Sequence, residues 1–170
     1  MSDMSGLQDT LSIFAEVAIA LAGFSGIVIA FGRRSLGSLS NLEKRRLSNL
    51  FFFSGLVLLL SLLGMSLLHI DFSDERTVWI GGSMVLAVVT AWWLLFDFRQ
   101  IRRLDPVERR QINPYLIVPF NIVAVLALGL QIANVVLIHK PWPVLLALVL
   151  AVAFAFQQFI LLVRMGLRDG

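Results

Sequence analysis

The sequence of 170 residues contains no cysteine. Disulfides, thiolate nucleophiles and metal centres held by cysteine are therefore excluded. There are only two histidines, too few for a centre that needs three imidazole ligands from one chain. Charged residues make up 15% of the chain, whereas an average soluble domain has about 25%. Most of the residue types that carry enzyme chemistry are thus scarce.

Apolar residues are abundant instead, at 58% of the chain, and the mean hydropathy is +0.87. A water-soluble domain of this size has too little interior to bury that much apolar surface. The composition excludes an ordinary soluble enzyme, a disordered protein and a nucleic-acid-binding module, and it predicts an integral membrane protein. We interpret the net charge of +3 as a preference for anionic lipid headgroups, because the basic residues stand between apolar runs.

Five apolar runs are long enough to cross a bilayer, which takes about 20 residues in a helix. They predict an all-α, polytopic protein organised as a single transmembrane domain over residues 1–170. The expected helices cover residues 11–31, 47–70, 78–98, 115–138 and 144–163. Ser40 and Glu43 have the spacing of a capping box, so the second helix is expected to begin near Asn41.

Basic residues are distributed unequally between the two sides of the predicted bundle. Twelve of the fourteen lie in the first connection, the third connection and the C-terminal tail, which all fall on one side. Because cytoplasmic loops carry an excess of Lys and Arg, we expect the N-terminus outside and the C-terminus in the cytoplasm. The compact chain without a targeting signal favours a bacterial cytoplasmic (inner) membrane.

The second and third helices resemble the fourth and fifth in outline. Residues 85–88 and 149–152 share the sequence Val-Leu-Ala-Val, and an alanine follows each at the same distance. A tandem repeat of the two hairpins is one interpretation. Chance is the other, since these residue types dominate membrane helices.

Glu16 is the one acidic residue well inside a predicted span, about 8 Å from its outer end at about 1.5 Å per residue. A carboxylate at this depth is costly unless it faces water or protein, so it indicates a functional site. If several copies of the first helix surround an axis, its face lines a narrow water path. The residues of this predicted ion pathway are Glu16, Ser12, Ile19, Ala20, Gly23 and Ile27.

In the alternative interpretation, Glu16 is an internal group of a monomeric bundle, bonded to Gln131 or Asn134 on the fourth helix. Asn121 on the same helix is expected to bond between helices as well. A neighbouring face of the first helix carries Ala18, Ala22 and Gly26, whose spacing of four is typical of close helix packing.

The sequence favours a small homo-oligomeric channel for monovalent cations, with the first helix lining the pore and Glu16 near the outer mouth. The alternative is a non-conducting accessory, scaffold or sensor subunit whose basic cytoplasmic loops bind partners or anionic lipid. A third interpretation is a small-molecule- or cofactor-binding membrane protein, or an enzyme, that uses Glu16, Gln131, Asn134 and the two histidines, His69 and His139. No phosphate-binding loop, nucleophile elbow or HExxH motif is present, so we expect no enzyme activity, no cofactor and no metal.

Overall fold

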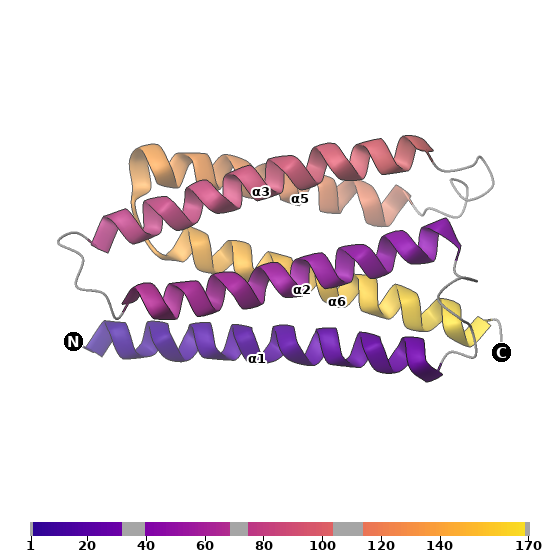
Figure 1. The fold of residues 1–170 in the computed structure, drawn as a ribbon. Helices are drawn as coiled ribbons and strands as arrows, with labels where there is room; N and C mark the ends of the chain where they lie inside the picture. Colours follow the sequence, from indigo (N-terminus) through magenta and orange to yellow (C-terminus); the bar gives the residue numbers. More distant parts are fainter. Residues whose placement is uncertain (1, 32–39, 69–74, 104–113, 169–170) are drawn as a thin grey trace. The chain divides into compact units, whose positions relative to one another are not determined.

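The computed structural model describes residues 2–31, 40–68, 75–103 and 114–168 (Figure 1). Apart from residue 40 and the turn at residues 139–141, these residues are helical, which confirms the all-α class. The elements are α1 (Ser2–Phe31), α2 (Asn41–Leu68), α3 (Glu75–Arg103), α5 (Pro114–Ala133), the π-helical turn η2 (Asn134–Ile138) and α6 (Trp142–Arg168).

Five helical segments are long and apolar enough to cross a membrane, as the sequence predicted. Many of their large apolar side chains are exposed: Trp92 on α3 by 68% and Leu137 in η2 by 76%. Such exposure suits lipid contact and suggests an integral membrane protein. The segments are Ser5–Gly26, Asn41–Leu68, Arg76–Arg102, Val118–Ile138 and Trp142–Arg164.

Helix α1 begins earlier than the predicted span because its first turns are polar, whereas α2 begins at Asn41, where the capping box predicted it. In α1, the Thr10 hydroxyl donates to the Gly6 carbonyl at 2.7 Å, within the helix. At the start of α2 the predicted capping box is confirmed. The Glu43 amide donates to Ser40 Oγ at 3.2 Å, and the Ser40 amide donates to Glu43 Oε2 at 2.8 Å. These bonds pair donors that the helix itself leaves free.

Most buried residues of α1, α2, α3 and α6 are spaced by three, four or seven positions. This is the heptad spacing, which keeps one seam of a helix facing its neighbours. On α2 the pattern joins Leu50, Ser54, Val57 and Ser61. The corresponding buried residues are Leu11, Ala15, Ala18, Leu21 and Ser25 on α1, Trp79, Ser83, Leu86, Trp93 and Asp97 on α3, and Leu148, Ala151, Ala155 and Gln158 on α6.

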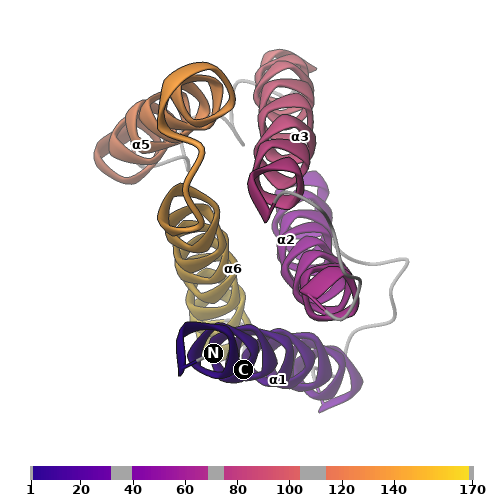
Figure 2. The ribbon, with the colours of Figure 1, turned by 90° about the vertical axis from the view of Figure 1, so that its left-hand side faces the viewer.

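The chain divides into two compact units. The first contains α1, α2 and α6 from Leu148 onward. Figure 2, a nearly end-on view, shows α1 next to both α2 and α6. Its core joins one residue from each of these helices, namely Leu21, Leu50 and Ala155.

In the first unit α1 and α2 run antiparallel. Leu21 packs with Leu50, while Leu11, earlier on α1, lies beside Gly64, later on α2. A Cβ atom added to Gly64 would stand 3.0 Å from Leu11 Cδ1. The missing side chain of Gly64 therefore makes room for Leu11.

The second unit contains α3, α5, η2 and the first residues of α6. Helix α3 contacts both α5 and η2. A Cβ atom on Gly82 of α3 would meet the Val144 side chain at 3.7 Å, an ordinary packing distance. The chain passes from α5 through η2 into α6, and Figure 2 shows this reversal clearly.

Candidate functional site

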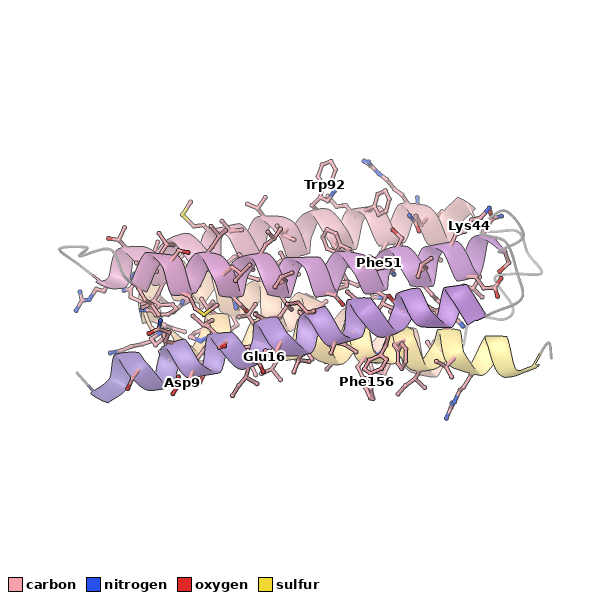
Figure 3. All side chains as sticks on the ribbon, turned by 60° about the horizontal axis from the view of Figure 1, so that its bottom comes forward. Asp9, Glu16, Lys44, Phe51, Trp92 and Phe156 are labelled. Atoms are coloured by element: carbon pink, nitrogen blue, oxygen red, sulfur yellow. The ribbon has the colours of Figure 1, made fainter. Side chains whose placement is uncertain are left out.

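The face of α1 opposite its packing seam carries the acidic residues. Glu16 is exposed, as are Asp9, Ala20 and Gly23 on the same side of the helix. Figure 3 shows the side chains of Asp9 and Glu16 projecting from one side of α1. This face is therefore free of the packing that buries Ala15 and its seam neighbours.

The other residues of the predicted pathway and packing faces vary in exposure. Ile19 is 57% exposed, whereas Ser12 is half-buried. The Ile27 side chain lies outside the described part of the chain. Of the predicted packing residues, Ala18 is buried, Ala22 is half-buried and Gly26 is exposed. Within the described residues, a Cβ atom on either Gly23 or Gly26 would meet nothing within 4 Å, so a second helix has room to approach.

A second polar arrangement joins α3, α5 and the turn before α6. Asn134 Nδ2 donates to Ser83 Oγ at 2.7 Å and to the Lys140 carbonyl at 3.0 Å, and Asn134 Oδ1 accepts from the Lys140 amide at 3.0 Å. Gln131 Nε2 donates to the Pro143 carbonyl at 2.8 Å. The Ser83, Gln131 and Asn134 side chains are at most 1% exposed. We call these five residues the Asn134 clamp.

The local sequence explains why the chain turns here. Asn134 begins the π-helical turn, and its carbonyl accepts from the His139 amide at 3.0 Å. His139 then adopts a left-handed conformation with φ of 54°, which ends the helix. Its ring atom Nε2 lies 3.0 Å from the Val135 carbonyl, close enough for a hydrogen bond.

The first turn of α6 leaves few backbone donors unpaired. Pro141 and Pro143 have no amide hydrogen. The amides of Val144 and Leu145 both donate to the Pro141 carbonyl, at 3.0 and 3.1 Å. The turn therefore leaves few backbone groups that need a water partner, which suits a position at the edge of a bilayer.

The Asn134 clamp contains two polar residues that the sequence predicted to form hydrogen bonds inside the bundle, Gln131 and Asn134. Asn134 bonds across to α3, and Gln131 bonds to the start of α6. Glu16 belongs to the other unit. Ser83 was not among the residues predicted from the sequence, although its place between Trp79 and Leu86 on the α3 seam was a usable signal. Asn121 is half-buried.

Basic residues gather at the start of α2, next to the capping box. Lys44 is exposed, while Arg45 and Arg46 are half-buried. Figure 3 shows Lys44 at this end of the helix. The amide end of a helix attracts negative charge, so lysine and arginine placed there reinforce a preference for anionic headgroups.

Within the ranges that the structure describes, no group of three or more acidic, histidine or cysteine side chains could hold a metal ion. His139 lies in the turn after η2, bonded to its own chain. His69 lies outside the described residues, so its predicted pairing with His139 stays a hypothesis.

Comparison with protein-family models finds no match for this chain. Comparisons with curated proteins and with solved structures find none either. The function is therefore argued from the chain's own residues.

Proposed function

We propose that the protein is a small homo-oligomeric channel in a bacterial cytoplasmic membrane that conducts monovalent cations. In this proposal α1 lines the pore, and Glu16 lies near the outer mouth. The N-terminus is outside and the C-terminus in the cytoplasm, as the distribution of basic residues indicates.

The observation that carries the proposal is the exposure of Glu16 on a helix apolar enough to span a membrane. Placing an acidic side chain against lipid costs up to about 3 kcal/mol, the value that insertion scales give for the centre of a bilayer. The cost falls when the carboxylate faces water or another protein surface. A water-filled pore formed by several α1 helices supplies both.

Cyclic symmetry would bring the same α1 face of each copy to a common axis. Ala20 and Gly23 on that face present little side-chain bulk, which leaves room for water along the axis. A ring of Glu16 carboxylates would then attract cations and repel anions, as acidic rings do in cation channels.

The test is ion flux into liposomes that contain the purified protein. We expect wild-type protein to admit potassium and Glu16→Gln to admit less, because the variant keeps the side-chain shape and removes the charge. Asp9→Asn, on the same side two turns nearer the N-terminus, is the matched control and should reduce flux less. Equal flux through wild-type and Glu16→Gln would remove Glu16 from the mechanism.

Copy number gives an independent test. Native mass spectrometry of the protein released from lipid vesicles should show a closed ring of several copies. A monomer would refute the symmetric pore, even if the protein is folded.

A second candidate function is a non-conducting accessory or scaffold subunit that binds anionic lipid. The exposed Lys44 beside Arg45 and Arg46 supports it. This candidate predicts no flux, and it predicts retained phosphatidylglycerol in the mass spectrum that is lost when Lys44, Arg45 and Arg46 are replaced by glutamine. The control replaces Arg76 and Lys140, which are also exposed but lie on the side expected outside, and it should retain the lipid.

A further inference from the structure

One exposed face of α3 carries three large apolar side chains and then two arginines. Val88, Trp92 and Leu95 are 69%, 68% and 61% exposed. Arg99 and Arg102 follow them and are exposed as well. The five positions are spaced alternately by four and three residues, so they lie in one line along the helix. We call these five residues the Arg102 strip.

The positive charge at the end of the strip is not neutralised within the described part of the chain. Arg99 and Arg102 form no ion pair with any residue of the described ranges. Asp97 is 4% exposed and belongs to the buried seam, about 160° around the helix from Arg99. Two like charges three positions apart on a helix repel each other. An anion bound between the two arginines would remove this repulsion.

The Phe98 ring positions one of the two arginines. Arg102 Cζ lies 4.4 Å from the centre of the ring, a distance typical of a cation–π contact. Phe98 is exposed, so the contact lies at the surface of α3. A guanidinium that is already held in place loses less freedom on binding, and its planar N–H groups match two oxygens of a phosphate.

The length of the strip matches one leaflet of a bilayer. The candidate membrane span of α3 ends at Arg102. Trp92 comes ten positions earlier, about 15 Å along the helix at about 1.5 Å per residue, and Figure 3 shows its ring projecting from α3. The hydrocarbon core is about 30 Å thick, so one leaflet supplies about 15 Å of it. With the arginines at the level of the headgroups, Trp92 lies where the acyl chains of that leaflet end.

We propose that the Arg102 strip binds one anionic phospholipid from the leaflet at the basic end of α3. Arg99 and Arg102 bind its phosphate, and one acyl chain lies along Leu95 and Trp92. A headgroup with net negative charge is preferred to a zwitterionic one, because it complements two positive charges. The site consists of residues of α3 alone, so it depends neither on the channel nor on the basic start of α2.

The experiment uses Trp92 to report the bound acyl chain. Full-length protein is placed in vesicles of phosphatidylcholine and phosphatidylglycerol of constant composition, with bromine on the acyl chains of an equal amount of one lipid or the other. Bromine quenches indole fluorescence on contact, and the difference between wild-type protein and Trp92→Phe isolates Trp92 from the other three tryptophans. We expect brominated phosphatidylglycerol to quench Trp92 more than brominated phosphatidylcholine does.

Replacing both arginines, by Arg99→Gln and Arg102→Gln, should remove this preference. Binding of phosphatidylglycerol is expected to weaken about fivefold for each arginine removed. Quenching by brominated phosphatidylcholine should persist, which shows that the variant is folded and inserted. The matched control combines Lys44→Gln with Arg164→Gln, which removes two exposed charges from α2 and α6, and it should keep the preference.

Several results would overturn the proposal. Equal quenching by the two brominated lipids in the wild-type protein means that the strip does not select an anionic lipid. A preference that survives the double arginine replacement, or that the control loses to the same extent, means that charge elsewhere causes it. Absence of quenching by both lipids means that another protein surface covers Trp92. Loss of the preference on addition of inorganic phosphate would show that the arginines bind free phosphate instead.

Discussion

Asn134 hydrogen-bonds the backbone of Lys140 in both directions, with its amide nitrogen and its amide oxygen each 3.0 Å from their partners. A third bond, from the same nitrogen, reaches Ser83 on α3. The Asn134 side chain thus pairs the backbone amide and carbonyl of the turn before α6 and links this turn to α3. Several consequences of this arrangement and of the helix seams are open to measurement.

Asn134→Ala should destabilise the protein strongly. The substitution leaves the Lys140 amide and carbonyl without their partner, and Ser83 loses a bond as well. We expect a loss of about 3 kcal/mol, since each buried polar group left unpaired costs about 1–3 kcal/mol. Thermal unfolding in detergent, followed by tryptophan fluorescence, gives the midpoint. Asn121→Ala, on the same helix at a half-buried position, is the control and should shift the midpoint less.

Gly64→Val should weaken the packing of α1 on α2. A Cβ atom at this position would stand 3.0 Å from Leu11 Cδ1, and Leu11 is only 2% exposed, so it has little room to move. Overpacking of this kind costs about 1–3 kcal/mol. Gly55→Val places the same side chain on the same helix, where nothing lies within 4 Å of the new Cβ among the described residues.

The same unfolding assay measures these variants. Leu11→Ala combined with Gly64→Val should recover part of the loss, because it clears the space that valine needs. If Gly64→Val and Gly55→Val have the same unfolding midpoint, the close approach of Leu11 to Gly64 is not a feature of the protein.

Cysteine cross-linking can test whether α1 faces α1 between copies. The chain has no cysteine of its own, so single variants report one position at a time. Gly23→Cys lies on the exposed face and should form dimers on oxidation or with a short bismaleimide. Ala15→Cys lies on the seam that is buried in the protein and should not. Disulfides require Cα atoms within about 7 Å, so equal yields at both positions would contradict the proposed pore.

The orientation of the protein in its membrane can be measured by labelling single cysteines at two exposed lysine positions. Lys140→Cys should react with an impermeant maleimide on intact cells or right-side-out vesicles. Lys44→Cys should react only after the membrane is opened, because its segment carries the basic residues expected in the cytoplasm. The reversed pattern would place the N-terminus in the cytoplasm.

The five helices that are long and apolar enough to cross a membrane could be predicted, because their signal lies in long, continuous apolar runs. The start of α2 could also be predicted, since Ser40 and Glu43 pair within one turn of the chain. Both features depend on neighbours in sequence. The polar first turn of α1 was missed because a hydropathy argument detects only the apolar part of a helix.

The hydrogen-bond partners in the Asn134 clamp could not be predicted from a single sequence. Asn134 and Ser83 are 51 positions apart, and nothing in the residues between them specifies that they meet. The π-helical turn changes the direction of the residues after Asn134, so regular α-helical spacing misplaces them. The types of Gln131 and Asn134 indicated polar bonding, but their partners required coordinates.

The clamp is mostly local in sequence, and this bears on how the chain enters its membrane. Gln131 meets Pro143 over 12 positions, and Asn134 meets Lys140 over six. The reversal between α5 and α6 can therefore satisfy its polar groups as soon as those few residues have been synthesised. The turn that joins α5 to α6 can thus form early, and only the bond to Ser83 has to wait until α3 lies alongside.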